Sequence, residues 1–385
     1  MEGPKKAKMK FWTAIEQFFK RNVLRFLEIL FKRKLLRLSE VDYRRIRRIL
    51  VIRQHDQLGD FLLSTPVLRA LREHFPDAHI AVLVRSYQEP VIRHNRHVDE
   101  RLIFQEIGYN WRPRTLWKFF RQLRSGFDLV IVLNTVSHSF TSDILAGLTG
   151  APYTLGSSQR QFPGTTRNFF YNLIAPCPED GRHQSAKNLE ILEYLHISTK
   201  NKREEITLLP EEQGWARRYL KKSGFTFDRP VVALHPGAGK VKNRWPAQNF
   251  AKTAEILVKK YDAQIALFHG QKEKNLADQV AEKANVPIKI MSDLTLRELA
   301  AVVSQTDLFI GNDTGTTHVA AAAGTPCVII FGPTDPNQWK PWGQEFAAIW
   351  GKDRRCESVS VKDVIRAGEK LLMQKGVLVS GSIGR

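Results

Sequence analysis

The stretch that most constrains the fold is DLFIGNDTGTTHVAAAAGTPCVIIFGPTDP, residues 307–336. Asp307–Ile310 and Thr325–Phe331 have the continuous apolar pattern of buried strands, and Thr316–Ala323 between them predicts a short helix of small residues. Two parallel strands joined by a helix form a βαβ unit, which belongs to sheets covered on both faces. The stretch therefore predicts a doubly wound α/β sheet.

The junction between this first strand and the helix, Asn312–Gly315, places polar groups at a helix start. Unpaired N–H groups and the positive end of the helix dipole bind anions there, and ligands of open α/β sheets bind at the carboxyl ends of the strands. We expect a diphosphate site; the alternative is an ordinary βαβ unit with a polar helix cap. The residues at or just after this junction are Asp313, Thr314, Gly315, Thr317 and His318.

A second loop with anion-binding character follows the predicted strand Val231–Leu234. This loop, His235–Trp245, combines a glycine-containing turn with three cations and leads into a helix. Because parallel strands end at the same edge of a sheet, we expect it to converge with the loop Asn312–Thr317. It is either an anion clamp or a solvated basic loop, and the residues alone leave both open. The three cations are Lys240, Lys242 and Arg244.

The first half of the chain begins the same kind of fold at Arg48–Arg53, a buried-strand pattern. The loop that follows, Gln54–Asp60, holds one glycine and no GxGxxG, which argues against a dinucleotide-dependent dehydrogenase. Apolar spacing predicts a helix over Phe61–Phe75. Asp60 then lies at the helix start, where it acts either as a cap or as a general base facing a cleft.

Strand and helix patterns alternate along the rest of the chain, which predicts parallel sheets with helices on both faces. Asn201–Pro210 has no strong periodic pattern, so we place the junction between two Rossmann-like domains near it. The predicted division is a basic amphipathic segment at 1–40, a first Rossmann-like domain at 41–205, a second at 206–352, and a C-terminal helix and tail at 353–385.

The amino-terminal segment holds much of the chain's charge. The formal net charge is +20, and residues 1–48 contain fifteen Lys/Arg against five Asp/Glu. This segment predicts a basic amphipathic helix on an anionic membrane surface or, alternatively, a helix packed on the protein's own core. No apolar run approaches the ~20 residues of a spanning helix, and no secretory signal or nucleic-acid-binding motif is recognisable. The apolar residues at helical spacing are Trp12, Ile15, Phe19, Val23, Phe26, Leu27 and Leu30.

The three cysteines, Cys177, Cys327 and Cys356, are far apart and form no CxxC pair. Neither a disulfide framework nor a zinc site is indicated, and a reducing compartment fits.

Four patches of the chain resemble glycosyltransferase family nine, the ADP-heptose:lipopolysaccharide heptosyltransferases. The resemblance extends from about Arg48 to about Gly351, and its D-T-G-x-x-H element is the most diagnostic part. The patches are QLGDFLLSTPVLRALREHFP (57–76), HPGAGKVKNRWPAQNFA (235–251), HGQKE (269–273), and NDTGTTHVAAAAGTP (312–326) with FGPTDP (331–336).

The resemblance implies a GT-B architecture, in which two Rossmann-like domains face each other across a cleft. The first domain then binds the acceptor and the second binds the nucleotide-sugar. Asp60 matches the proposed catalytic base, and Glu273 matches an acidic residue near the nucleoside. The residues that match the element around the donor diphosphate and sugar are Asp313, Thr314, Gly315, Thr317 and His318.

One departure from the family pattern concerns the second patch. Family members commonly have Lys-x-Trp-Pro, with the lysine near the donor phosphates, whereas this chain has Asn243 at the lysine position. Lys242 or Arg244 is expected to replace it, with Lys240 as a further candidate.

The resulting hypothesis is an inverting transferase that moves heptose from ADP-heptose to a lipopolysaccharide core. The sequence has no Asp-x-Asp motif, so the cations are expected to replace a metal, and no cofactor is expected. The expected partners are a lipid-linked phosphorylated saccharide and an anionic membrane bound through residues 1–40, at the inner face of the cytoplasmic membrane. The alternatives are a relative with another nucleotide-sugar donor, a non-catalytic nucleotide-binding protein and, from charge alone, a nucleic-acid-binding protein.

Overall fold

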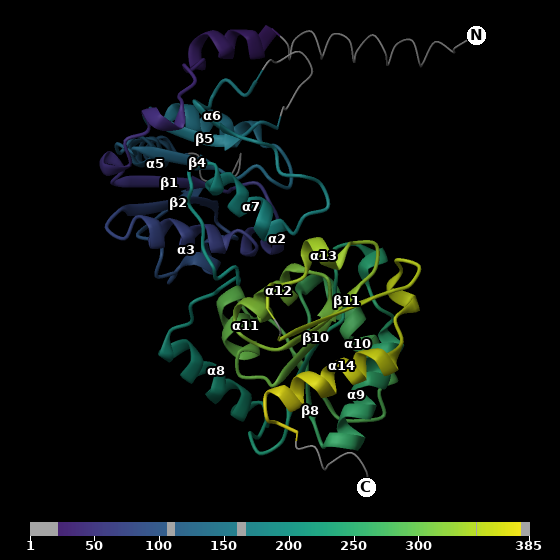
Figure 1. The fold of residues 1–385 in the computed structure, drawn as a ribbon. Coiled ribbons are helices and arrows are strands. Elements are labelled where there is room, and N and C mark those ends of the chain that lie inside the picture. Colours follow the sequence, from purple (N-terminus) through teal and green to yellow (C-terminus); the bar gives the residue numbers. More distant parts are fainter. Residues whose placement is uncertain (1–21, 106–111, 160–166, 344, 379–385) are drawn as a thin grey trace, which may run out of the picture.

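The computed structural model describes residues 22–105, 112–159, 167–343 and 345–378. The chain folds into two α/β domains that lie one above the other, the first in purple to teal and the second in green to yellow (Figure 1). Each domain is built on one six-stranded sheet, as the alternating pattern predicts.

The first sheet is entirely parallel and has the strand order β3-β2-β1-β4-β5-β6. Its central pair, β1 and β4, is in register with Val51 opposite Ile131. The order reverses between these two strands, which makes their carboxyl ends the expected ligand-binding edge. The strands are β1 (Arg48–Ile52), β2 (His79–Arg85), β3 (Glu100–Phe104), β4 (Leu129–Val132), β5 (Tyr153–Ser157) and β6 (Leu173–Ala175).

The second sheet is also parallel and has the order β12-β11-β10-β7-β8-β9. Read from β9 to β12, its strands follow the same order as β3 to β6 of the first sheet. Its switch point lies between β7 and β10. The prediction of two doubly wound domains is therefore confirmed. The strands are β7 (Val231–His235), β8 (Gln264–Phe268), β9 (Ile288–Met291), β10 (Leu308–Asn312), β11 (Cys327–Phe331) and β12 (Phe346–Trp350).

Helices cover both faces of each sheet, and the apolar sides of strands and helices form the cores between them. In the first domain one face carries α2 (Leu58–Leu62), α3 (Thr65–His74) and α7 (Gln184–Glu193), and the other carries α5 (Pro113–Leu123) and α6 (Phe140–Leu148). In the second domain one face carries α9 (Ala247–Tyr261), α10 (Lys274–Lys283) and α14 (Val361–Gln374), and the other carries α8 (Pro210–Lys222), α11 (Leu296–Val303) and α12 (Gly315–Ala322). Two shorter helices are α4 (Glu89–Ile92) and α13 (Pro336–Trp339).

The helix expected over Phe61–Phe75 is two helices, α2 and α3, with a break at Leu63–Ser64. The Ser64 hydroxyl donates to the carbonyl of Phe61 at 2.6 Å, so that carbonyl is satisfied without a continuing helix. Pro66 then occupies the first turn of α3, where its missing N–H costs nothing. As a result Asp60 lies inside a short helix of its own.

The amino-terminal segment is described from residue 22, so residues 1–21 of the expected amphipathic helix lie outside the described residues. Residues 22–31 are helical, and Leu24, Leu27 and Phe31 pack against the outer core of the first domain. The opposite side of the same helix exposes Phe26 and Leu30, each 61% accessible. One stripe of this helix thus packs on the protein's own core, and a second apolar stripe faces solvent. Contact with a membrane stays a prediction. No helix in the described ranges is both long and apolar enough to cross a membrane.

The crossover between the domains, residues 198–209, is held by two buried arginines. Arg69 pairs with Glu205, and the Arg297 guanidinium Nε lies 2.6 Å from Glu212 Oε1. Glu204 is also buried and accepts a hydrogen bond from the backbone N–H of Trp342 at 3.1 Å. Burial raises the pKa of Glu204 to about 7.

Replacing Glu204 by glutamine is expected to stabilise the fold above neutral pH. A raised carboxyl pKa means that the folded chain holds its proton up to about pH 7, so stability falls as pH rises from about 4.5 to 7. The glutamine amide does not ionise, so the variant does not lose folding stability as the pH rises through this range. We expect a melting temperature about 2–4 °C above wild type at pH 8 and equal to it at pH 4.5, in thermal denaturation. Glu193→Gln, at an exposed site, is the control; a shift of equal size at both pH values would contradict the assignment.

Candidate functional site

A cavity of about 470 Å³ lies where the carboxyl edges of the two sheets meet. The first domain contributes Gln57, Gly59 and Asp60 from α2 and its entry, and Val136 from the loop after β4. The second domain contributes residues that follow β7, β10 and β11. The cavity is thus formed at both switch points at once, the position that doubly wound sheets use for ligands.

Asp60 is the acidic residue that the first domain presents to the cavity. Its Oδ2 accepts a hydrogen bond from the backbone N–H of Gln57 at 3.3 Å, as a helix-capping carboxylate does. Burial and the neighbouring Asp56 carboxylate raise the pKa of Asp60 to about 6, although the Arg53 guanidinium opposes the rise. Asp60 therefore caps α2 and also has the pKa of a proton acceptor that works near neutral pH.

A buried ion pair lies behind Asp60. Arg53 Nε is 2.8 Å from Asp56 Oδ2, and both side chains are almost inaccessible to solvent. The guanidinium also donates to the Thr135 hydroxyl at 2.9 Å, which ties the loop after β1 to the loop after β4. This pair was not predicted from the sequence, although a carboxylate three residues after an arginine at a strand end was a signal for it.

The start of α12 faces Asp60 from the second domain. Asp313, Thr314, Gly315 and His318 all line the cavity. The first amides of a helix have no acceptor within it, and the buried Thr314 hydroxyl has no hydrogen-bond partner among the described residues. Asp313 Oδ2 accepts from the Thr334 hydroxyl at 2.6 Å, and burial raises the pKa of Asp313. The arrangement supplies donors to an oxygen-rich ligand.

His318 is a neutral imidazole that touches the first domain. Burial, followed by the influence of His183, lowers the pKa of His318 to about 4, so its 4.0 Å approach to Asp313 Oδ1 is not an ion pair at neutral pH. A Cβ on Gly59 would lie 2.9 Å from His318 Cδ2, closer than carbon atoms pack. Glycine at position 59 thus allows α2 and α12 to approach each other directly.

The loop after β7 is bound to the end of β10 by one side chain. Asn312 Nδ2 donates to the carbonyls of Pro236 (2.8 Å) and Gly237 (3.2 Å), and its Oδ1 accepts from the backbone N–H of Trp245 (2.9 Å). The predicted convergence of the two loops is therefore present. Thr317 does not line the cavity; its hydroxyl donates to the Asn312 carbonyl at 2.6 Å and supports the same junction.

Lys240 is the cation of this loop that lines the cavity, next to Asn243. Asn243 Oδ1 is buried and has no hydrogen-bond partner among the described residues. Lys242 and Arg244 are not part of the lining; Arg244 Nε donates to the carbonyl of Ala238 at 2.9 Å. Of the three cations, Lys240 is therefore the one that borders the cavity, whereas the two expected ones, Lys242 and Arg244, do not.

Glu273 lies outside the cavity lining, behind the loop after β7. His235 Nε2 is 3.3 Å from its Oε2, and this contact lowers the pKa of Glu273 to about 2. A Cβ on Gly237 would lie 2.2 Å from the Glu273 carboxyl group, so the carboxylate fits only against a glycine. Glu273 is placed to order this loop.

A family model describes most of the chain. The model for glycosyltransferase family 9 (heptosyltransferase) matches residues 116–366. The chain belongs to this family. It is therefore a glycosyltransferase, and the resemblance carried by the four sequence patches is confirmed.

Relatives of this family 9 chain cover nearly its whole globular part. Lipopolysaccharide heptosyltransferase 3 of Escherichia coli K12 is 28% identical over an alignment of 339 residues, and the match covers 82% of this chain and 95% of that protein. A crystal structure of a family 9 glycosyl transferase from Veillonella parvula has a TM-score of 0.77 at 25% identity and covers 87% of this chain and 99% of its own. The structure of E. coli ADP-heptose LPS heptosyltransferase II, at 20% identity, has a TM-score of 0.69 and covers 86% and 99%. The expected GT-B fold is thus confirmed.

Proposed function

We propose that this family 9 enzyme transfers heptose from ADP-heptose to a lipopolysaccharide core acceptor, with inversion and without a metal. The observation that carries the proposal is the shared cavity, in which Asp60 faces the start of α12 across the domain boundary. The names of the relatives supply the substrates: a lipopolysaccharide heptosyltransferase and an ADP-heptose-dependent enzyme of the same fold.

In the proposed reaction Asp60 removes the proton from an acceptor hydroxyl while that oxygen bonds to the anomeric carbon. The bond between that carbon and the diphosphate oxygen breaks, and ADP leaves from the opposite face, which inverts the configuration. Negative charge then grows on the diphosphate. The first amides of α12, the Thr314 hydroxyl and the Lys240 ammonium group are placed to stabilise it.

The assay that tests the proposal mixes purified protein, ADP-heptose and a truncated lipid A–core acceptor. Release of ADP together with a product heavier by one heptose is the expected result. A donor panel that includes ADP-glucose and UDP-sugars separates this assignment from a relative with another donor. ADP binding in calorimetry with no turnover of any donor would support the non-catalytic alternative instead, which the asparagine at position 243 keeps open.

The pH dependence of the reaction is expected to report the ionisation of Asp60. The base must be deprotonated, and its pKa is raised to about 6, so kcat/KM should fall about tenfold per pH unit below pH 6 and level off above it. Initial rates between pH 4.5 and 8.5, with circular dichroism at each pH to verify folding, check this. A flat profile down to pH 5 would contradict the role of Asp60.

We propose that the amino-terminal segment binds the anionic inner face of the cytoplasmic membrane, where the lipid-linked acceptor lies. The exposed stripe of helix 22–31 supports this, because Phe26 and Leu30 face solvent beside Arg25 and Lys32. Phe26→Ser/Leu30→Ser should weaken sedimentation with phosphatidylglycerol vesicles about tenfold and leave turnover of a water-soluble acceptor unchanged. Arg25→Gln/Lys32→Gln should act in the same direction and reduce the salt dependence. Unaltered sedimentation of both variants would refute the contact.

A further inference from the structure

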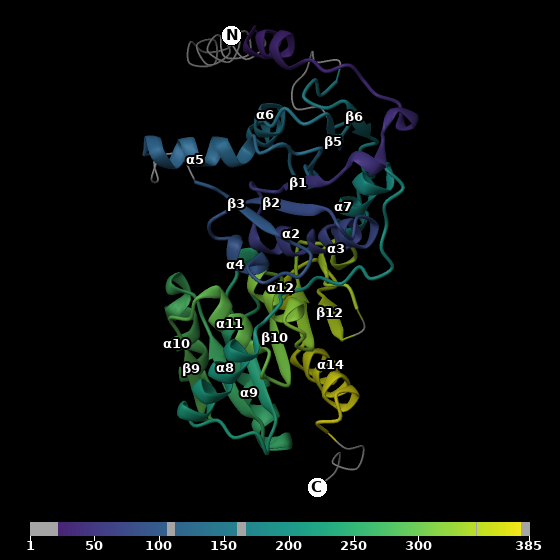
Figure 2. The ribbon, with the colours of Figure 1, turned by 90° about the vertical axis from the view of Figure 1, so that its left-hand side faces the viewer.

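Helix α5 packs against the core of the first domain along only a narrow strip of its surface. Leu123 is its one buried residue, and the helix extends sideways from the first sheet (Figure 2). Residues 112–124 contain no Asp or Glu and carry five exposed cations. Within the described ranges no ion pair neutralises any of these cations, and an excess of positive charge of this kind favours an anionic partner. The cations are Arg112, Arg114, Lys118, Arg121 and Arg124.

Two large aromatic side chains stand among these cations. Trp117 is 64% accessible and Phe120 is 42% accessible, and the Arg121 guanidinium lies over the Trp117 ring, 5.4 Å from its centroid. Phe119 and Leu123 are the side chains of α5 that pack on the core of the domain, and neither Trp117 nor Phe120 belongs to that core. Phe120 borders the groove beside the helix. Exposed aromatic rings between Lys and Arg are typical of helices at the headgroup region of a bilayer.

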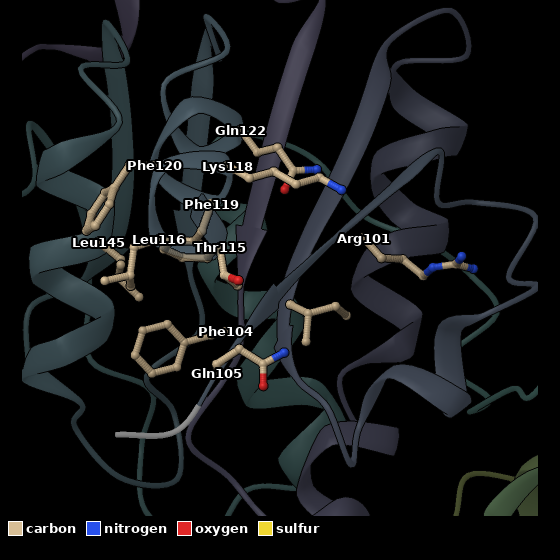
Figure 3. A pocket seen from close by; sticks show the side chains of 11 residues that line it. Arg101, Phe104, Gln105, Thr115, Leu116, Lys118, Phe119, Phe120, Gln122 and Leu145 are labelled. Atoms are coloured by element: carbon tan, nitrogen blue, oxygen red, sulfur yellow. The ribbon is translucent and has the colours of Figure 1, made fainter. Parts of the chain in front are cut away.

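An apolar groove of about 350 Å³ opens beside this helix. Figure 3 shows Phe104, Leu116, Phe119 and Leu145 around the hollow, with Lys118 and Gln122 towards one end. The groove lies between α5, β3 and α6, on the side of the first sheet away from the second domain. Among the described residues nothing covers this groove, and apolar surface of this kind favours a partner that removes it from water.

The same outer side of the first domain carries helix 22–31. Leu24 of that helix and Leu123 of α5 belong to one apolar core, together with Leu145 of α6. In Figure 2 helix 22–31 lies at the end of the molecule away from the second domain, and α5 extends to one side at the level of α6. Each helix presents exposed apolar side chains flanked by basic ones, so the same chemistry occurs on two elements of the first domain.

We propose that α5 and its groove form a second docking site for an anionic bilayer, separate from helix 22–31. Trp117 and Phe120 enter the headgroup region, the cations of α5 bind lipid phosphates, and apolar lipid groups fill the groove. Two separate contacts fix the orientation of the first domain on the surface, which a single helix does not do. This site is independent of the transfer chemistry, because no residue of α5 lines the cavity that contains Asp60.

The test is sedimentation of the full-length chain with vesicles of phosphatidylethanolamine and phosphatidylglycerol (3:1), and with phosphatidylcholine vesicles for comparison. Trp117→Ser/Phe120→Ser should weaken binding to the anionic vesicles about tenfold. Arg114→Gln/Lys118→Gln/Arg121→Gln should weaken it by about 10²-fold at low salt, because each cation near such a surface contributes about 1 kcal/mol. The matched control removes three exposed cations from α8, as Arg218→Gln/Lys221→Gln/Lys222→Gln, and should bind as wild type does.

A second measurement follows Trp117 itself. Brominated lipids should quench part of the tryptophan fluorescence of the wild type, and Trp117→Phe should lose that part while it still sediments. Binding of the α5 variants equal to wild type would overturn the proposal. So would a wild-type dimer in light scattering that the α5 variants convert to a monomer, because the surface would then be an interface between copies. Turnover of a soluble acceptor is measured in parallel, so failure of docking and failure of the transferase assignment are distinguishable.

Discussion

Replacing Asp60 by asparagine is expected to lower turnover by about 10²–10⁴-fold and to leave ADP affinity close to wild type. A positioned general base contributes a factor of this size, and asparagine keeps the shape of the side chain without its basicity. The amide oxygen can still accept the hydrogen bond that the Gln57 N–H gives to Oδ2, so α2 should remain capped. Measuring kcat by ADP release and Kd for ADP by calorimetry separates loss of chemistry from loss of binding.

The matched control for this variant is Asp77→Asn, which removes one exposed carboxylate from the same domain. It should keep full turnover and the wild-type melting temperature. Full turnover by Asp60→Asn would refute the general-base assignment. If this variant loses turnover and ADP affinity together, Asp60 contributes to binding rather than to proton transfer alone.

Replacing Lys240 by methionine is expected to lower kcat/KM for the donor by about 10²-fold, since removing one group that stabilises developing charge costs about 10²–10³-fold. Methionine retains most of the side-chain volume and removes the charge. Lys240 lines the cavity beside Asn243, and Lys242 does not. Affinity for ADP should fall as well, because the same ammonium group is proposed to contact the product diphosphate.

Lys242→Met, two residues away on the same exposed loop, is the control for Lys240→Met and should change kcat/KM by less than threefold. The opposite ranking of the two variants would assign the phosphate contact to Lys242. An Asn243→Lys variant adds a further test: a lysine there that restores turnover to Lys240→Met would show that both positions reach the same phosphate.

Much of the fold could be predicted from the sequence because buried parallel strands are continuous apolar runs. Val231–Leu234 and Gln264–Phe268 were located to within a residue on this basis. The break between α2 and α3 was missed, since it depends on how Ser64 satisfies a carbonyl locally. Strand β6 has three residues and was also missed, as so short a run carries little periodicity.

The candidate site was predictable only in part, because the loops after strands can be located from sequence but their side chains cannot. The rule for parallel sheets placed Asp60 and the start of α12 each at the carboxyl edge of its own sheet, and the resemblance implied that the two domains face each other. The structure brings the two to one cavity. Val136, in the loop after β4, and Trp339, the last residue of α13, line it too, yet neither lies in a recognisable motif. The choice among the three cations depends on how Asn312 holds the loop, which is a tertiary contact.

The direct contact between α2 and α12 links the evolution of the two domains. A Cβ on Gly59 would meet the His318 ring, and one on Gly315 would lie 3.2 Å from Leu58 Cβ. A larger side chain on one helix therefore requires a smaller side chain opposite it on the other helix. We expect single enlargements at these positions to destabilise the fold and compensating pairs to be tolerated. We therefore expect the residues at these positions to covary among family members. Grafting a second domain from a relative, in order to change the donor, should then require α2 of the same relative.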